Sequence, residues 1–463
     1  MSSLPSVLVI SADTVGPSMA GSGIRYWNLA AILGRQQRVT LAIPNEAEMK
    51  PPPGVDIVTY GPGDWVERGH RQAELVAQHD IILCQIPPYA FTPEEVLAER
   101  HMVIDLYAPW FLEKLEYARV DPERGIPNRQ DDMQILQRVM ALGDFYICAS
   151  ERQRDFWLGA LTMAGRLDPQ RQSADPELRS LIDVVPFGLP TGRPIPHGPG
   201  PRQAFPQIGA RDPLVLWNGG IWNWLDPFTA IQATHLLVEK GIPCRLVFMG
   251  IKNPGAEIAE MESAERAMNL ARELGLLDSH VFFNDWVPYE DRQNWLMQAT
   301  LTLSLHQPTI EARFAFRTRV LDNLWCRVPL IATEGDVLAD MVADEGLGAT
   351  VPPGNPVAVA AAIERVSATE RQHELRQRLA TVAQRYTWEQ VAEPLAAYCA
   401  DPWKHRAGRE QSDYVQRIER LYAETAEYAR HLEATLAERE REARKLAAER
   451  GWRDRLRAWR LRA

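Results

Sequence analysis

Short apolar runs alternate with stretches of helical periodicity along most of the chain. The runs are rich in β-branched side chains, as buried strands are, and the stretches between them repeat apolar positions every three or four residues. The pattern predicts strands at 6–11, 39–43, 55–60, 81–86, 102–106, 145–149 and 183–186, and again at 214–217, 245–249, 281–283, 301–305, 330–333 and 349–351. It predicts helices at 66–78, 93–100, 129–142, 151–162, 227–240, 255–275, 289–298, 318–326, 336–343 and 356–368. Alternating strands and helices indicate parallel sheets that helices cover on both faces.

The chain divides into two such series at residues 189–212, which are dense in proline and glycine and lack periodicity. With 463 residues, the chain is too long for one hydrophobic core. We therefore predict an α/β protein with two Rossmann-like, doubly wound domains and a cleft between them, where pockets tend to form. The predicted parts are a first domain at 1–188, a linker at 189–212, a second domain at 213–385, a crossover helix region at 386–409 and a helical, basic tail at 410–463.

The tail has a different pattern from the two domains. Between 410 and 450, apolar residues such as Val415, Ile418 and Tyr422 follow a 3,4 spacing, which predicts a long helix. A coiled coil that joins copies of the chain into a homo-oligomer is one interpretation, and packing of the helix against its own body is the other. Residues 450–463 alternate arginine with tryptophan and leucine, so they can contact an anionic membrane surface or form a frayed basic end.

Net charge and cysteine content exclude several classes of protein. The formal net charge of −10 argues against general affinity for nucleic acid. The five cysteines are widely spaced, which argues for a reducing compartment with no disulfide framework and no zinc site. No apolar run approaches the ~20 residues that cross a membrane, and residues 1–13 hold a first strand and not a signal peptide. We expect a cytoplasmic protein that its basic tail can bring to the inner face of the membrane.

The stretch from His306 to Asp336 carries the strongest chemical signal. It runs from one predicted strand through a loop with Arg313, Arg317 and Arg319 into a helix and a second strand. Ligands of open α/β sheets bind beyond the carboxyl ends of strands, and arginine grips phosphates with two hydrogen bonds. The stretch therefore predicts a site for a phosphate or diphosphate, with a salt-bridged surface loop as the alternative.

A glycine-rich turn opens the first domain. Gly16, Gly21 and Gly23 precede a helical pattern, so a ligand can approach the backbone there, although the spacing is not that of a dinucleotide-binding fingerprint. Asp105 ends another predicted strand, and such strand ends would face the cleft. A flexible turn and a helix or turn cap are the alternatives for these two features.

Four stretches, taken in their order and spacing, resemble the GT-B glycosyltransferases, specifically glycosyltransferase family 4. They are VLVISADTVGPSMAGSGIRYWNLAAIL, VVPFGLP, VFFNDWVPYEDRQNWLMQATLTLSLH and RFAFRTRVLDNLWCRVPLIATEGD, and the resemblance spans about residues 5–400. The chain also departs from the family pattern. Phe314 occupies the place of the first glutamate of the Glu-x7-Glu element, with Asp322 at the second, and Ile221 and Asp226 replace an arginine and a lysine.

The resemblance implies transfer of a sugar from a nucleotide-diphosphate sugar to a glycan or lipid-linked acceptor, with retained configuration, in cell-surface polysaccharide or glycan assembly. The nucleotide sugar is a substrate, so no cofactor is expected. The absence of an Asp-x-Asp motif and of a histidine cluster fits a metal-independent enzyme. A nucleotide-sugar 2-epimerase on the same fold and a catalytically silent binding or scaffold protein are the alternatives.

The resemblance also assigns site residues, with the donor on the second domain and Arg317 and Arg319 on its diphosphate in place of the missing basic pair. The donor-side residues are Gly219, Gly220, Trp286, Val287, Ala315, Phe316, Arg317, Arg319 and Asp322, with Asp322 on the ribose and Trp286 and Val287 beside the base. The residues assigned to catalysis are His306, Glu311 and Arg317, where Glu311 can substitute for the acid missing at 314. The acceptor would enter at the first domain near Gly21, Gly23, Arg25, Asp105 and Tyr107.

Overall fold

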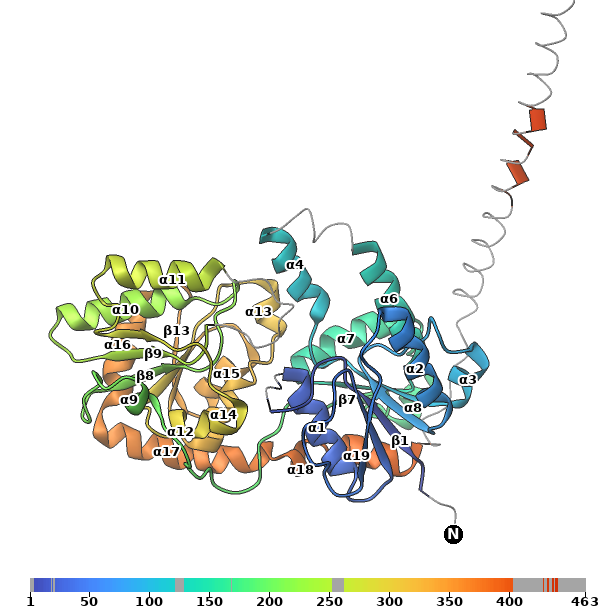
Figure 1. Ribbon diagram of the computed structural model, residues 1–463, viewed down its shortest axis with the longest axis horizontal. Helices are drawn as coiled ribbons and strands as arrows, with labels where there is room; N and C mark the ends of the chain where they lie inside the picture. The colour runs from blue at the N-terminus through green and yellow to red at the C-terminus, as the bar shows by residue number, and fades with distance from the viewer. Residues whose placement is uncertain are drawn as a thin grey trace, which may run out of the picture. The chain divides into compact units, whose positions relative to one another are not determined.

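Two parallel β-sheets with helices packed on their faces form the body of the protein (Figure 1). The structure is a computed structural model that describes residues 4–17, 19, 21–120, 129–167, 169–251, 262–402 and a few positions between 428 and 439. Every strand that the apolar runs predict is present, and each end lies within two residues of its expected place. The two Rossmann-like sheets of the predicted fold class are therefore confirmed.

The first sheet has seven parallel strands in the order β3-β2-β1-β4-β5-β6-β7, counted over the described residues. Its strands are β1 Val7–Ile10, β2 Val39–Ile43, β3 Val55–Thr59, β4 Ile81–Cys84, β5 His101–Asp105, β6 Phe145–Cys148 and β7 Ile182–Val184. Its helices are α1 Gly21–Leu33, α2 Trp65–Ala77, α3 Glu94–Glu99, α4 Trp110–Val120, α6 Arg129–Leu142, α7 Glu151–Met163 and α8 Pro169–Ala174. All of β1 is buried, as expected for a strand in a sheet covered on both faces. The strand order reverses between β1 and β4, and such a switch point opens a crevice beyond the carboxyl ends of the strands.

The second sheet follows the same plan with the strand order β10-β9-β8-β11-β12-β13. Its strands are β8 Leu214–Trp217, β9 Arg245–Phe248, β10 Val281–Phe283, β11 Leu301–Ser304, β12 Leu330–Thr333 and β13 Gly348–Val351. Its helices are α9 Pro201–Ala204, α10 Pro227–Glu239, α11 Glu262–Glu273, η1 Tyr289–Asp291, α12 Arg292–Leu296, α13 Ile310–Phe314, α14 Arg319–Cys326, α15 Val337–Asp344 and α16 Pro356–Ser367. Here the order reverses between β8 and β11, which places a second crevice beyond those two strands.

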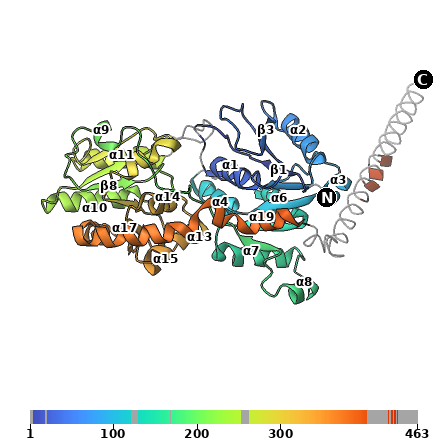
Figure 2. The same cartoon turned by 90° about the horizontal axis from the view of Figure 1, so that it is seen from below.

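The chain returns from the second sheet to the first through its last described helices, drawn in orange in Figure 2. They are α17 Thr369–Ala383, η2 Gln384–Tyr386, α18 Trp388–Val391 and α19 Glu393–Ala400. Leu189 N donates to the carbonyl oxygen of Tyr386 at 2.7 Å, and Trp388 N donates to that of Leu189 at 3.1 Å. Both α18 and α19 contact α1. The linker that leaves the first half is thus paired with the segment that comes back to it.

The helices differ from the sequence pattern in a few places. The pattern does not predict α4, because charged residues interrupt its apolar positions. The helix expected at 255–275 is described only as α11, since residues 252–261 lie outside the described residues. The helix expected at 289–298 is a 3-10 turn followed by a short helix that ends at Leu296. The loop before α14 contains a further helix, α13.

Most of the predicted tail at 410–463 lies outside the described residues, so the coiled coil, the homo-oligomer and the membrane contact stay predictions. Tyr428, Leu432 and Leu436 are described, and all three are helical and exposed. The domain boundaries also stay predictions. Among the described residues, no helix combines the length and the apolar character that crossing a membrane requires.

A buried ion pair ties α1 to the end of β5. Arg25 donates from Nε to Asp105 Oδ2 at 2.7 Å and from Nη2 to Oδ1 at 3.0 Å, and both side chains are fully buried. Burial lowers the pKa of Arg25, but the charge and hydrogen bonds of Asp105 more than offset this, so that the pKa lies above its ordinary value. Because α1 begins at the crevice, this pair fixes one edge of the crevice to the sheet.

Replacing Asp105 should destabilise the fold strongly. Asp105→Asn keeps the shape of the side chain but leaves the buried guanidinium of Arg25 without a counter-charge, which costs about 3–5 kcal/mol. Urea denaturation followed by circular dichroism measures the free energy of unfolding. Arg35→Ala is the control, because its ion pair with Glu389 is largely exposed, at 56% and 34%, and is worth at most about 1 kcal/mol. Equal losses in the two variants would contradict a special role for the buried pair.

Candidate functional site

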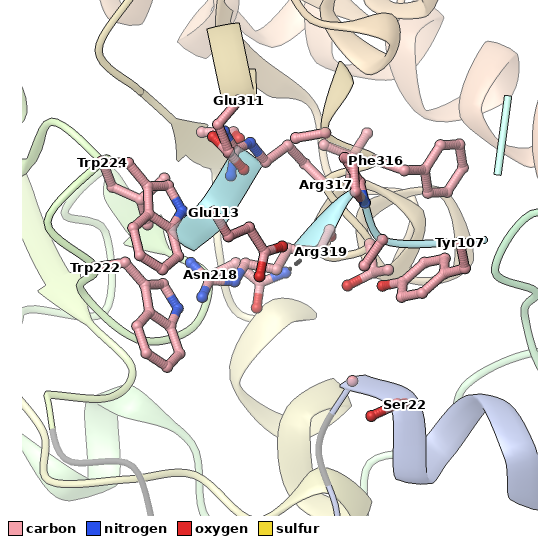
Figure 3. Close-up of a pocket in the computed structure, with 18 of the residues that line it drawn as sticks. Ser22, Tyr107, Glu113, Asn218, Trp222, Trp224, Glu311, Phe316, Arg317 and Arg319 are labelled. Carbon is pink, nitrogen blue, oxygen red and sulfur yellow. Dashed lines mark hydrogen bonds and ion pairs between the residues drawn. The ribbon is translucent and has the colours of Figure 1, made fainter. Parts of the chain in front are cut away.

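A cavity of about 450 Å³ lies where the crevices of the two sheets face each other (Figure 3). Its wall takes Asp13 and Gln85 from the segments that follow β1 and β4, and Asn218 and Leu305 from those that follow β8 and β11. These segments flank the switch points of both sheets. Strand topology therefore places the cavity, as expected for ligand sites of open α/β sheets.

The basic stretch forms one side of the cavity. α13 begins after Thr309, whose side chain caps the helix by accepting a hydrogen bond from Ala312 N at 3.1 Å. Residues 315–318 then lead into α14, which begins at Arg319, and this whole segment lines the cavity. The first amides of a helix and its dipole attract anions. Arg317 and Arg319 thus lie at a helix start that itself favours negative charge.

Arg317 is held by two carboxylates. Its Nη2 donates to Glu311 Oε2 at 2.7 Å, and its Nε lies 3.8 Å from Asp336 Oδ2. Glu311 and Asp336 are each only 2% exposed. Asp336 also caps α15 by accepting a hydrogen bond from Ala339 N at 2.6 Å. Much of the charge of Arg317 is therefore neutralised by the protein, and its guanidinium is fixed in one orientation at the cavity wall.

Arg319, in contrast, has no carboxylate partner among the residues that the structure describes. Its Nη1 donates to the carbonyl oxygen of Gly220 at 3.0 Å, and its own carbonyl accepts from Asn218 Nδ2 at 3.0 Å. Gly219 permits this approach, since a Cβ there would lie 2.4 Å from Arg319 Nε. Burial and the charge of Arg317 lower the pKa of Arg319 to about 10, with the charge of Asp322 opposing them, so the group stays charged at neutral pH. A partly buried charge without a counter-charge costs free energy until an anion joins it.

Other donor-side residues lie beside the cavity and not on its wall. Asp322 Oδ1 accepts a hydrogen bond from Arg292 Nε at 2.8 Å, while its Oδ2 makes no hydrogen bond with the described residues. Trp286 is partly exposed and Val287 is buried. A Cβ on Gly220 would lie 3.7 Å from the ring of Trp286, so this tryptophan borders the loop that holds Arg319.

His306 lies away from the cavity, although the sequence suggests a catalytic contact for it. It is 1% exposed, with Nδ1 3.0 Å from the carbonyl oxygen of Gln307 and Nε2 3.4 Å from Asp336 Oδ2. It borders a separate groove together with Arg313. In this geometry His306 supports Asp336, and through it Arg317, instead of reaching a ligand.

The predicted acceptor-side residues divide into two groups. Gly21 and Tyr107 line the cavity. Gly23 does not, and a Cβ there would lie 2.3 Å from a backbone oxygen, so this glycine serves close packing. Arg25 and Asp105 are buried in their ion pair, and the guanidinium of Arg25 lies 4.8 Å from the centre of the Tyr107 ring. The pair therefore positions Tyr107 and does not itself reach the cavity.

Phe314, at the place where the family pattern has an acid, docks α13 on the first half of the chain. Its ring centre lies 4.7 Å from that of Phe156 in α7, and its carbonyl oxygen accepts from Gln153 Nε2 at 2.8 Å. Arg152, at the start of the same helix, pairs with Asp340 of α15. Phe314 thus helps to hold the two halves together beside the cavity, through a ring contact that a carboxylate could not make.

One cavity residue, Glu113, gives little signal in the sequence. It lines the cavity together with Trp222 and Trp224, and all three are labelled in Figure 3. Glu113 escapes notice because it lies in the first turn of α4, which the pattern does not predict. Burial raises the pKa of Glu113 to about 7, with the charge of Glu311 adding to the rise and that of Arg317 opposing it. The cavity therefore contains a carboxyl group that is partly protonated at neutral pH.

The described residues contain no group of three or more His, Cys, Asp and Glu side chains that could hold a metal ion. The charges placed to meet an anionic ligand are those of Arg317 and Arg319, supported by the start of α14.

Comparisons with known proteins agree with this fold. Residues 212–369 match the family model described as glycosyl transferases group 1. The fold is similar to that of a sucrose-phosphate synthase from Thermosynechococcus elongatus, with 16% identity, coverage of 86% of this chain and 99% of that chain, and a TM-score of 0.58. It is similar to Anabaena HepE, solved in complex with UDP-glucose, with 15% identity, coverage of 85% and 100%, and a TM-score of 0.56. A Listeria monocytogenes protein assigned as a UDP-N-acetylglucosamine 2-epimerase has 13% identity, coverage of 88% and 99%, and a TM-score of 0.52. At these identities the likenesses show the fold alone, and no curated protein sequence matches the chain.

The raised pKa of Glu113 predicts a pH-dependent stability. The folded protein holds the Glu113 proton more tightly than the unfolded chain does, so the stabilisation is complete below the ordinary pKa of 4.5 and is lost as pH rises through about 7. The free energy of unfolding of the wild type should therefore fall relative to that of Glu113→Gln between about pH 5 and about pH 8. Urea denaturation of both proteins at each pH measures this difference. If the difference in unfolding free energy between the two proteins stays constant with pH, the pKa of Glu113 is not strongly raised.

Proposed function

We propose that this chain is a group 1 glycosyltransferase of the GT-B fold, and that it transfers its sugar to a glycan or lipid-linked acceptor during cell-surface polysaccharide or glycan assembly. Transfer from a nucleotide-sugar donor follows from the family. The class of acceptor, the retained configuration and the independence from metal belong to the proposal.

The uncompensated charge of Arg319 is the observation that supports this proposal most directly. The guanidinium lines the cavity at the start of α14 and has no acidic partner among the described residues. Its hydrogen bond to Gly220 holds it in place without neutralising it. A nucleotide-diphosphate sugar offers an anion of suitable size and charge, because two linked phosphates can meet the arginine and the helix amides together.

The chemistry of transfer requires positive charge at this place. As the bond between the anomeric carbon and the diphosphate oxygen breaks, negative charge grows on the departing diphosphate. Donors that are already oriented toward that charge lower the barrier, because they need no rearrangement during the reaction. Arg319 supplies the net charge, and Arg317, fixed by Glu311 and Asp336, supplies oriented hydrogen bonds.

Retention and metal independence follow from the same arrangement in our proposal. The acceptor hydroxyl attacks the face of the sugar that the diphosphate leaves, and the departing phosphate oxygen takes the hydroxyl proton. This route needs no separate strong base. Two arginines and a helix start provide the charge that a divalent cation provides in other sugar transferases.

The remaining donor residues are proposed to hold the nucleoside. Asp322 keeps Oδ2 for the ribose hydroxyls, since Arg292 bonds only its Oδ1. Trp286 and Val287 flank the base next to the Gly219–Gly220 turn. UDP is the first nucleotide to test, because the similar Anabaena protein is solved with UDP-glucose.

The alternatives from the sequence have less support. A 2-epimerase would need a histidine and carboxylates together in the cavity, whereas His306 lies outside the cavity wall. The fold likeness to the Listeria protein does not distinguish the two activities. The silent scaffold rests on the residues missing from the family pattern, and Arg319 offers a replacement for the missing positive charge.

Removing Arg319 should weaken nucleotide binding. Arg319→Ala is expected to lower the affinity for UDP or GDP, whichever binds, by roughly ten- to a hundredfold, because hydrogen bonds to charged groups are worth about 1.5–3 kcal/mol. Isothermal titration calorimetry with both nucleotides measures the change. Arg319→Lys should recover only part of the loss, since lysine keeps the charge without the bidentate geometry.

Arg313→Ala is the matched control for this experiment. Arg313 lies in the same basic stretch but is exposed and does not line the cavity. Its replacement should leave nucleotide affinity unchanged. If Arg319→Ala binds as tightly as the wild type, or if the wild type binds neither nucleotide, the proposed donor site is wrong.

A further inference from the structure

Glu113 brings a carboxyl group into the cavity from the first half of the chain. The side chain is partly buried and makes no hydrogen bond or ion pair with any residue that the structure describes. Nearby charge comes from Glu311, which repels it, and from Arg317, which is already paired with Glu311. A buried polar group normally finds a partner, so the hydrogen-bonding capacity of Glu113 is available to a ligand.

Two tryptophans from the second half line the same cavity (Figure 3). The rings of Trp222 and Trp224 are stacked, with centres 5.4 Å apart and planes inclined by 8°. Trp224 is buried, whereas Trp222 is partly exposed and presents aromatic surface to the cavity. Flat aromatic surface with a polar edge suits a ligand that is apolar on one side and wet on the other.

The segment that carries the tryptophans is fixed in several places. The side chain of Asn223 accepts a hydrogen bond from Ser263 Oγ at 2.8 Å, and Gln307 N donates to the carbonyl oxygen of Trp224 at 3.0 Å. Asp226 then caps α10 by accepting from Thr229 N at 3.0 Å. The aromatic surface is thus held ready before a ligand arrives, which reduces the entropy lost on binding.

Packing alone explains part of this arrangement but not all of it. Trp224 belongs to the core of the second half, and Trp222 packs against that core. A purely structural aromatic pair would not require, on the same cavity wall, a carboxyl group that has no partner among the described residues. Sugars match both features, because a pyranose ring packs its C–H groups on aromatic faces and offers hydroxyls to carboxyl groups.

The charges in the cavity indicate which sugars fit. Asp13, Glu113 and Glu311 all line it, whereas Arg317 and Arg319 lie at the start of α14, where the diphosphate is proposed to bind. A uronic acid in the part bounded by Glu113 would place a further carboxylate near those of Glu113 and Glu311, which is unfavourable in a partly buried site. An uncharged sugar avoids this repulsion.

We propose that Glu113, Trp222 and Trp224 form a subsite for one uncharged pyranose ring, with the ring packed on Trp222 and its hydroxyls hydrogen-bonded to Glu113. This inference rests on the proposed function, since the ring belongs either to the nucleotide-sugar donor or to the acceptor. Glu113 and Trp222 are the residues that determine specificity in this subsite.

Calorimetry with matched ligands tests the subsite directly. The wild type, Trp222→Ala and Glu113→Ala are titrated with UDP-glucose, GDP-mannose, UDP and GDP. If the subsite holds the donor sugar, each variant binds the nucleotide sugar roughly tenfold more weakly, in line with about 1.4 kcal/mol for the lost contact, and binds the free nucleotide as the wild type does. Trp65→Ala is the control, because Trp65 is 72% exposed on α2 and does not line the cavity.

A second measurement identifies an acceptor sugar. If the ring belongs to the acceptor, the affinities for the nucleotide sugars stay unchanged in both variants. Saturation-transfer NMR with methyl α-glucoside and methyl α-mannoside on the nucleotide-loaded protein then gives a signal for the wild type that both variants lose.

Charge selectivity separates a direct contact from a structural role. UDP-glucuronate, or methyl glucuronide in the NMR measurement, should bind the wild type roughly tenfold more weakly than its uncharged counterpart. Glu113→Gln keeps the shape and the hydrogen bonds of the side chain but removes its charge, so it should reduce the difference in affinity between the charged and the uncharged sugar. Replacing a residue that only supports the fold would leave that difference in affinity unchanged.

The outcomes separate the subsite from the proposed function. If free nucleotide binds but Trp222→Ala and Glu113→Ala match Trp65→Ala in both measurements, the subsite is wrong and the donor site stands. If the wild type binds neither free nucleotide, the proposed function fails, and the subsite fails with it.

Discussion

A guanidinium that forms no ion pair with the described part of the chain dominates the cavity. Arg319 lies at the start of α14, next to a second cation, and is partly buried. Keeping such a charge partly buried lowers the stability of the folded protein when no anion is bound, and the packing of the two sheets offsets this loss. The loop at Gly219 and Gly220 is shaped around the side chain, because a Cβ at Gly219 would overlap it. Asp322 lies near enough to act on this charge, but no carboxylate among the described residues forms an ion pair with it.

The acids near Arg319 are each occupied by another group. Glu311 and Asp336 hold Arg317, and Asp322 pairs with Arg292. Arg317 can therefore contribute orientation while Arg319 contributes charge, a division of roles that two identical side chains do not reveal in the sequence. Glu113 differs from the other acids because it makes no hydrogen bond or ion pair with the described residues and enters from the opposite half of the chain.

The contact between the two halves of the chain also holds part of the cavity wall in place. Phe314 packs on Phe156, and Gln153 donates to the backbone of Phe314, so the segment that leads to Arg317 is held by the first half. Where the family pattern has a carboxylate, this chain has an aromatic contact between its halves. Phe314 therefore attaches the loop to the first half, and a carboxyl group, that of Glu113, lies on the cavity wall.

The sequence by itself determined the strands, their alternation with helices and the position of the basic stretch. These depend on local patterns, because burial on both faces requires continuous apolar runs and a helix requires periodic ones. It could not determine which charged groups meet. Arg25 and Asp105 are indistinguishable from ligand-binding residues in the sequence, yet they pair with each other in the core. His306 lies in the expected stretch but does not line the cavity, and Glu113 reaches the cavity from a helix with no clear pattern. The partner of a side chain depends on distances between segments far apart in the chain, and only the tertiary structure sets those distances.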